Sequence, residues 1–180
     1  MSAADVEAQE VLMDPSLHDE LVAARLAFQL LLASLSDEDL ARKSHNPAWT
    51  NKQILFHMAL GFFLLPILCP LALLFGRLPP VCSQAFARLL NSLTRPFNAI
   101  NALGAYIGGY VLTRAGLGKI FDVVYALSLQ LAKYIPAREW KRGMFYPTRW
   151  EPLFNSYMTL EDVYRFPVRH FYSHVSQIAR

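Results

Sequence analysis

Residues 159–178 read TLEDVYRFPVRHFYSHVSQI and have the pattern of an amphipathic helix with its own start signal. Thr159 is a favourable N-cap residue, and the acidic pair Glu161 and Asp162 suits the first turn of a helix. Apolar and aromatic positions then recur every three or four residues, which predicts one face turned toward a core. Pro167 predicts that the helix bends or restarts near its middle. The residues predicted to face the core are Val163, Pro167, His170, His174 and Ile178.

The two histidines on this face are four residues apart, which places both imidazoles on one side of a helix, about 6 Å apart along its axis. Both side chains can therefore reach one metal ion, and His57, on the inward face of another predicted helix, supplies a third nitrogen. Three neutral imidazoles with one open position are the ligand set of a reactive site. Position 171 is Phe, so the arrangement HExxH with its catalytic glutamate is absent. The alternative is that each is a core or helix-end histidine with a hydrogen-bond partner. The two remaining histidines are predicted to lie at the surface: His18 and His45.

Three further apolar stripes predict three further helices. Asp14-Pro15 starts a helix over residues 15–35, and Thr50 with Gln53 forms a capping box that starts the second. A third stripe runs over residues 117–135 and is stopped by Pro136. No stretch has the strict alternation of a strand. The sequence therefore predicts an all-α four-helix bundle formed by a single domain over residues 1–180.

Residues 66–116 predict a long apolar, basic crossover within this bundle. Proline and glycine divide it, with short helices expected around residues 83–92 and 100–113. Residues 55–76 carry no formal charge and are long enough to span a membrane, but Pro66 and Pro70 favour a buried helix that breaks near Pro66 and continues as an apolar turn. The spacing of Gly104 and Gly108 fits either a membrane homodimer or tight helix packing.

The composition shows where the apolar excess and the charge lie. The 180 residues are 54% hydrophobic and 17% charged, and the formal net charge of +3 combines −8 over residues 1–40 with +11 over the rest. No acid lies between Asp39 and Asp122, where eight bases occur. This basic middle predicts contact with an anionic ligand or a membrane surface, or pairing with the acidic first helix. The bases are spread among apolar residues and no recognition motif occurs, so nucleic-acid binding is not expected. Two cysteines without a pairing motif and the lack of a signal-peptide pattern predict a cytoplasmic location, with membrane association as the alternative.

Several motifs together resemble the DinB-like (YfiT-like) superfamily of metal-binding four-helix-bundle proteins. The first is Trp49-Thr50 leading into Ile54-Leu55-Phe56-His57, and the second is Thr159-Leu160-Glu161-Asp162 followed by His170, His174 and Gln177-Ile178. Residues 35–40 and 140–143 are also similar to family segments. The resemblance implies an up-up-down-down bundle with one long crossover and a divalent metal (zinc, nickel or iron) held by His57, His170 and His174. The apolar residues 62–75 and Pro167 depart from the family pattern.

The resemblance also implies an activity, because family members include transferases and an isomerase that use low-molecular-weight thiols such as bacillithiol or mycothiol. We therefore expect a metal-dependent transferase that acts on a small molecule. Arg165 and Arg169 are candidates for holding a thiol's carboxylates, and Tyr164 and Tyr172 for donating protons, with solvated or packing roles as the alternatives. No acid is placed by a motif as a general base, which disfavours a hydrolase. The alternative function is a non-catalytic, metal-binding or vestigial bundle that docks on a membrane or a protein partner through its apolar middle.

Overall fold

The apolar stripes of the sequence form long helices, and the prediction of an all-α protein is confirmed. The computed structural model describes residues 13–180, so the acids Asp5, Glu7 and Glu10 of the N-terminal flank lie outside the described residues. The four long helices are α2 (Pro15–Ser34), α4 (Asn51–Phe63), α8 (Arg114–Ala132) and α9 (Leu160–Val175). The other elements are α3 (Asp37–Ala41), α5 (Leu65–Phe75), α6 (Pro80–Ser92), α7 (Thr94–Val111), a 3₁₀ turn (Ala137–Glu139), and strands β1 (Gly143–Phe145) and β2 (Tyr157–Thr159).

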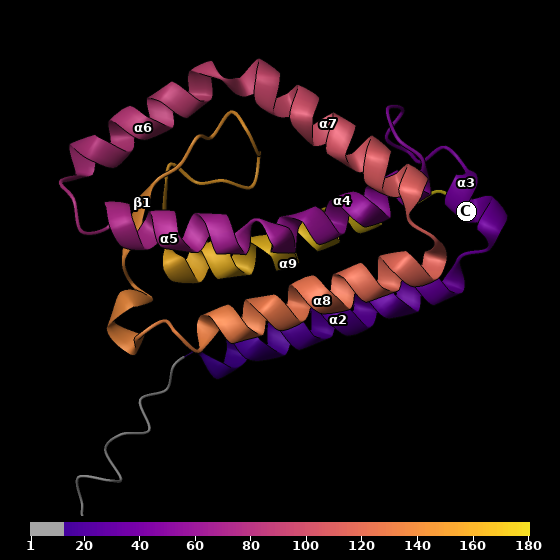
Figure 1. The fold of residues 1–180 in the computed structure, drawn as a ribbon, viewed down its shortest axis with the longest axis horizontal. Coiled ribbons are helices and arrows are strands. Elements are labelled where there is room, and N and C mark those ends of the chain that lie inside the picture. Colours follow the sequence, from indigo (N-terminus) through magenta and orange to yellow (C-terminus); the bar gives the residue numbers. More distant parts are fainter. Residues whose placement is uncertain (1–12) are drawn as a thin grey trace, which may run out of the picture.

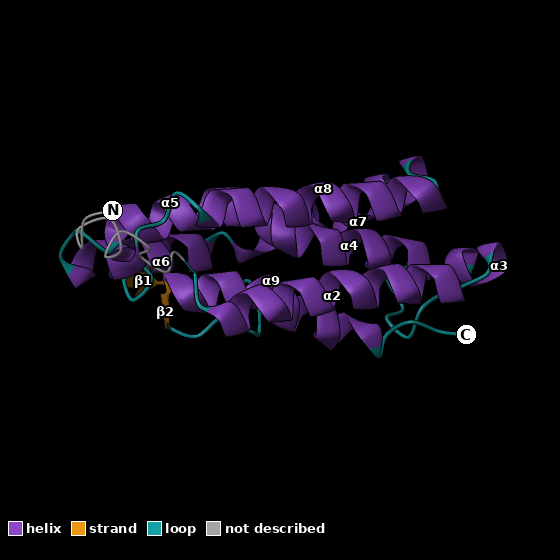
Figure 2. Cartoon of the chain, turned by 90° about the horizontal axis from the view of Figure 1, so that it is seen from below, coloured by secondary structure: helices purple, strands orange, loops and turns teal. Residues whose placement is uncertain are grey.

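These four helices lie side by side along the long axis of the molecule (Figure 2). Helix α2 packs against α8 and α9, and α4 packs against the same two helices. Each helix contributes one buried phenylalanine to a central cluster, in which the rings of Phe28 and Phe121 stack with centroids 3.9 Å apart. Phe62 and Phe171 meet Phe121 at 5.0 and 6.2 Å. Burial of such rings is the main force that holds a bundle together.

The helix directions differ from those that the family resemblance implies. Helix α2 runs from the left to the right of Figure 1, α4 and α8 run back, and α9 runs in the direction of α2. The order along the chain is therefore up-down-down-up rather than up-up-down-down. It arises because the short α3 turn reverses the chain after α2, whereas the α6–α7 crossover returns it to the end where α4 began.

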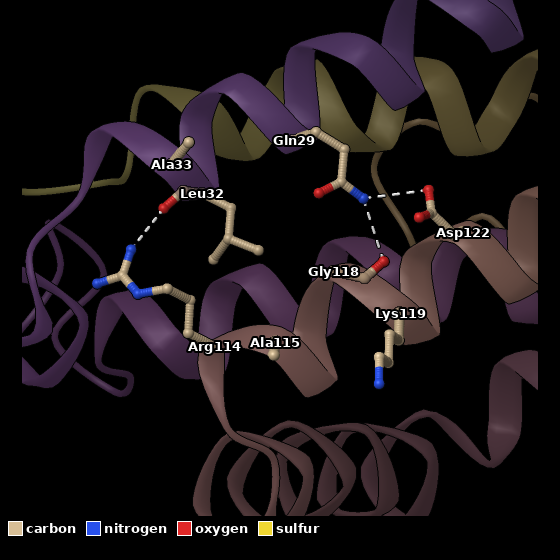
Figure 3. Close-up of a pocket in the computed structure, with 8 residues that line it drawn as sticks. All are labelled: Gln29, Leu32, Ala33, Arg114, Ala115, Gly118, Lys119 and Asp122. Carbon is tan, nitrogen blue, oxygen red and sulfur yellow. Dashed lines mark hydrogen bonds between the residues drawn. The ribbon is translucent and has the colours of Figure 1, made fainter.

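Polar contacts join α2 to α8, as Figure 3 shows. The side-chain amide of Gln29 donates to the carbonyl of Gly118 and to the carboxylate of Asp122, both at 3.1 Å, and Arg114 donates to the carbonyl of Leu32 at 2.7 Å. A surface hollow of about 360 Å³ lies beside these groups. Because most of its polar groups bond to one another, the hollow is a helix–helix contact and not a candidate site.

The predicted break near Pro66 is present at Leu64, but the chain continues beyond it as a helix, α9 does not restart at Pro167, and two short strands were not predicted. Helix α5 follows α4 after a break at Leu64, so the predicted apolar turn beyond Pro66 is wrong; Pro66 lies in the first turn of α5, where its missing N–H costs nothing. Helix α9 continues through Pro167, which is buried in the core together with its neighbours, and this packing outweighs the one lost hydrogen bond. Strands β1 and β2 pair antiparallel over three residues each, too short for their alternation to be visible in the sequence.

The crossover forms an arch of α6 and α7 above α4 and α5, with the loop of residues 146–156 beneath it (Figure 1). The predicted short helices are both present and longer than expected. Helix α7 approaches α4 through its glycines: a Cβ atom at Gly108 would overlap the ring of Phe56, and one at Gly109 would lie 2.8 Å from the Cα atom of Gln53. Gly108 and Gly109 therefore provide tight helix packing, whereas a Cβ atom at Gly104 would make only an ordinary contact with Leu60.

Two helical stretches of the described residues pass the length and composition test of a membrane span: Asn51–Phe75, taken across the break at Leu64, and Arg114–Ala132. Both contribute buried side chains to the bundle core, among them Met58, Phe62 and Phe121. Core helices of soluble proteins pass the same test, so this finding is weak evidence for a membrane location.

Candidate metal centre

Two capping boxes fix the helices that carry the three histidines. The Thr50 hydroxyl accepts from the backbone N–H of Gln53 at the start of α4, and Thr159 accepts from Asp162 at the start of α9, as the sequence predicts. His57 lies two turns into α4, and His170 and His174 lie in the second half of α9.

The buried side chain of Asn51 ties these two helices together, a role that its position in the capping motif does not reveal. Its amide nitrogen donates to the carbonyls of Asp39 at 2.8 Å and Ala179 at 2.6 Å, and its oxygen accepts from the N–H of Ala179 at 3.0 Å. The backbone N–H of His45 donates to the carbonyl of Gln177 at 2.8 Å. The segment after α9 is thus fastened to the start of α4, which sets the distance between the histidines of the two helices.

The three imidazoles converge on one point through their Nε2 atoms. The Nε2 atom of His170 lies 3.0 Å from that of His57 and 3.2 Å from that of His174, and all three ligand atoms lie within 4.8 Å of one another. Zinc–nitrogen bonds of 2.0–2.1 Å in a tetrahedron give nitrogen–nitrogen separations of about 3.3 Å. The two separations that involve His170 are close to this value, and the third is no more than 4.8 Å, so the three residues could hold a single divalent ion.

Burial keeps the three imidazoles in the form that a metal requires. Desolvation lowers the pKa of His57 to about 3, with a further contribution from His174, and burial is also the main cause of the lowered pKa values of His170 and His174. All three rings are therefore neutral at pH 7, and neutral imidazole is the metal-binding form. The pKa directions and the convergence of the Nε2 atoms both favour ligation.

The three imidazoles contact one another through their Nε2 atoms and, within residues 13–180, do not each pair with a separate group of the core. Among the described residues, the Nε2 atom of His170 is within hydrogen-bond distance of the other two Nε2 atoms, and the three buried Nδ1 atoms have no partner. Core polar groups are normally paired. The ring of Trp49 packs against His57 at 4.7 Å and that of Phe166 against His170 at 5.4 Å, so one wall of the site is aromatic. His18 and His45 are exposed, as predicted.

Glu151 lies beside the convergence point and was missed by the sequence reasoning, which expected no general base. Its Oε2 atom is 4.0 Å from the Nε2 atom of His170, and its Oε1 atom accepts from the N–H of Leu153 at 3.1 Å. Burial raises the pKa of this carboxyl, partly opposed by the bond from Leu153. This 4.0 Å distance is longer than the 3.0 and 3.2 Å that separate the Nε2 atoms, so the carboxylate lies beside the three imidazoles and is not a fourth member of the cluster. A space of about 30 Å³, room for about one water, is lined by His57, His170 and Glu151 among others.

The other candidate residues lie away from the three histidines. Arg165 pairs with Glu20 and with Glu161 at 3.2 Å, and only 18% of its side chain is exposed, so neither the thiol-binding role nor a fully solvated one fits it. Arg169 is exposed. Tyr164 is buried and donates its hydroxyl to the carbonyl of Ser128 at 3.2 Å, which is a packing role, and Tyr172 is exposed.

Gly61 lets α4 approach the ring of His170. A Cβ atom at this position would lie 2.8 Å from Nδ1 and 3.4 Å from Cγ of that imidazole, closer than side chains normally pack. We expect Gly61→Ala to displace His170 and to weaken zinc binding by about 10- to 100-fold, the usual range for groups that orient a ligand. Titration with zinc in competition with a chromogenic chelator measures this change.

Gly104→Ala is the matched control, because its Cβ atom would meet only the Cδ1 atom of Leu60, at an ordinary 3.7 Å. Alanine raises helix propensity at both positions, so unfolding of the helix does not explain a loss at Gly61 alone. Equal zinc affinities for the two variants and the wild type would show that Gly61 does not position His170.

A bundle of helices with three converging imidazoles from two of them defines an all-α protein with a candidate metal site. The family model described as DinB superfamily matches residues 20–178, and the chain belongs to this superfamily. The comparisons with curated proteins and with solved structures gave no match.

Proposed function

We propose that the protein is a metal-dependent transferase in which His57, His170 and His174 hold a divalent ion: zinc, nickel or iron. The observation that supports this most strongly is the convergence of three neutral Nε2 atoms with the carboxylate of Glu151 beside them. Three protein ligands leave a position open for a reactant, as in catalytic rather than structural zinc sites. The reactant proposed here is a low-molecular-weight thiol, in line with the activities of thiol-dependent members of the superfamily.

The bound ion would supply Lewis acidity, which lowers the pKa of a thiol or water that binds it. Glu151 would accept the proton of the thiol, since its carboxylate lies 4.0 Å from the Nε2 atom of His170 and burial raises its pKa, which favours proton uptake. The sulfur then forms a bond to an electrophilic carbon of the substrate, the bond from that carbon to its leaving group breaks, and the leaving group departs with the electron pair. The proton held by Glu151 is available to that leaving group.

Cobalt(II) substitution tests the proposed thiol site without knowledge of the substrate. We expect cysteine, bacillithiol or mycothiol, added to the cobalt-loaded protein, to produce the near-ultraviolet charge-transfer absorption of a thiolate bound to cobalt. His174→Ala, which lacks one ligand, should give no such absorption at the same concentrations. A cobalt spectrum that no thiol changes would contradict thiol binding at this site.

A second function, docking on an anionic membrane, is favoured by the unusual burial of α7. This helix turns its small residues Ala105, Gly108 and Gly109 inward and its large apolar residues outward, the reverse of an ordinary surface helix. Ile100 is 71% exposed and Tyr110 is 79% exposed. Together the outward residues form the α7 face, which consists of Ile100, Leu103, Tyr106, Ile107, Tyr110 and Val111.

The charge of helices α6, α7 and α8 favours a membrane over a second copy of the chain as the partner of the α7 face. Arg88, Arg95 and Lys119 are exposed and form no ion pair within residues 13–180, and no acid lies between Asp39 and Asp122. A dimer through α7 would bring these like charges together, whereas anionic headgroups would neutralise them. Helix α7 carries Arg95 and no acid, and an apolar face on a helix without acids is typical of helices that bind anionic membranes.

Vesicle flotation tests membrane docking. We expect the protein to float with phosphatidylglycerol vesicles at low salt, to float less at high salt, and to ignore phosphatidylcholine vesicles. Ile100→Glu should abolish binding. Leu30→Glu, at an equally exposed (72%) leucine on α2, is the matched control and should not change it. Binding that Ile100→Glu leaves intact, or dimerisation that Ile100→Glu removes, would contradict docking of this face on membranes.

A further inference from the structure

An apolar cavity of about 260 Å³ lies beneath the arch of α6 and α7. Its walls come from α5, α6, the start of α7, β1 and the loop of residues 146–154, and include Leu68, Leu71, Phe86, Leu90, Met144 and Trp150. Aspartate, glutamate, lysine and arginine are absent from its lining, so the cavity suits an uncharged, apolar group. Ile67, which is 52% exposed, stands at its edge and marks the side that opens to solvent.

This cavity adjoins the candidate metal centre. Leu64, Phe97 and Phe154 line both the cavity and the small space next to His57 and His170. The two spaces also share one loop, since Trp150 lines the cavity while the next residue, Glu151, faces the histidines. A molecule with its reactive end at the histidines would therefore have its remaining part beside or within the cavity.

Specific contacts hold the cavity open before any ligand arrives. The indole of Trp150 stacks on Phe97 with centroids 4.0 Å apart, and its N–H donates to the carbonyl of Leu90 at 2.6 Å. The N–H of Arg149 donates to the side chain of Asn91 at 3.0 Å. The loop is thus fastened to α6 and α7, and a preformed pocket binds without the cost of ordering its walls.

We infer that this cavity binds the apolar part of the electrophilic substrate, a role that rests on the proposed function. An apolar cavity of about 150 Å³ accepts benzene, so 260 Å³ has room for about ten carbon atoms. The substrate class is therefore a small molecule with a medium-length alkyl chain or a bicyclic aromatic group. Its electrophilic carbon and leaving group lie at the end that reaches the histidines, and the polar thiol enters from elsewhere.

Binding of straight-chain alcohols tests the cavity independently of the metal. Calorimetric titration of the full-length protein with butanol, hexanol, octanol and decanol should give affinities that rise about fourfold per methylene. Leu68→Trp, which fills part of the cavity, should weaken decanol binding by about tenfold, the equivalent of fewer than two methylenes. Leu74→Trp is the matched control, because Leu74 lies on the same helix with its side chain exposed to solvent and does not line the cavity. This variant should bind decanol as tightly as the wild type.

Alkyl hydroxamates, whose headgroup binds divalent metals, test the connection to the histidines. For the zinc-loaded protein, octanohydroxamate should bind more tightly than acetohydroxamate by the same factor per methylene, and Leu68→Trp should reduce this difference by about tenfold, as it does for decanol. Alcohol affinities that do not depend on chain length or on Leu68→Trp would overturn the cavity's role, whatever the metal result. If the alcohols bind as expected but the affinity for hydroxamates does not depend on zinc, the proposed function would be overturned, and with it the role of the cavity in binding the substrate.

Discussion

Replacing His57 by alanine is expected to reduce zinc affinity by more than about 100-fold. Groups that merely orient a metal ligand change affinity by about 10- to 100-fold, so the loss of a ligand should cost more. We choose His57 because it is the one ligand that comes from α4. Without it, both remaining imidazoles come from α9. The loss should therefore leave a weak two-histidine site.

Thermal unfolding with and without a chelator measures this effect. At a zinc concentration about 100 times the dissociation constant, binding stabilises the folded protein by about 2.7 kcal/mol, or a Tm increase of about 5–10 °C for a chain of this size. The chelator should remove that increase in the wild type and in His18→Ala, the control at an exposed histidine, and should have no effect on His57→Ala. A chelator-sensitive Tm that His57→Ala retains would mean that the metal binds elsewhere.

Replacing Glu151 by glutamine is expected to lower the rate of thiol transfer by about 10²- to 10⁴-fold while the metal stays bound. The amide has the same shape as the carboxylate but cannot take a proton. The bond from the Leu153 N–H to the side-chain oxygen can be retained, so the loop should keep its conformation. The expected effect is therefore on the proton transfer and not on the architecture of the site.

Two measurements separate these effects: the metal content of the purified variant, and its rate with a small thiol and a chromogenic aryl chloride. Glu161→Gln is the control, since Glu161 forms a surface ion pair with Lys141 at 2.7 Å. An unchanged rate for Glu151→Gln would exclude Glu151 as the proton acceptor. Loss of the metal would show that the carboxylate is itself a ligand.

The sequence predicts the helices and the histidines well because both depend on local patterns. The N-caps Thr50 and Thr159 fix where α4 and α9 begin, and the stripe on α9 places His170 and His174 on one face. Once two helices with inward histidines are expected to pack in one bundle, the meeting of His57 with the other two follows. The structure brings together all three predicted ligands.

Glu151 could not be predicted because nothing periodic places it. It lies in a loop whose path depends on the stacking of Trp150 on Phe97 and on hydrogen bonds to α6, all of them contacts between residues far apart in the sequence. The continuity of α9 through Pro167 has a similar origin, since a local rule predicts a bend or a restart and the burial of Pro167 in the core keeps the helix continuous. The glycines of α7 can be seen in the sequence, but nothing in the sequence shows that they pack against α4.

His57, His170 and His174 are proposed to hold one divalent ion. The most direct test of this proposal is elemental analysis of purified wild-type protein beside His174→Ala after both are loaded with zinc, nickel or iron(II) and desalted. We expect about one ion per chain in the wild type and little or none in the variant. A wild-type protein that retains none of these metals, or a variant that retains as much as the wild type, would contradict the proposal.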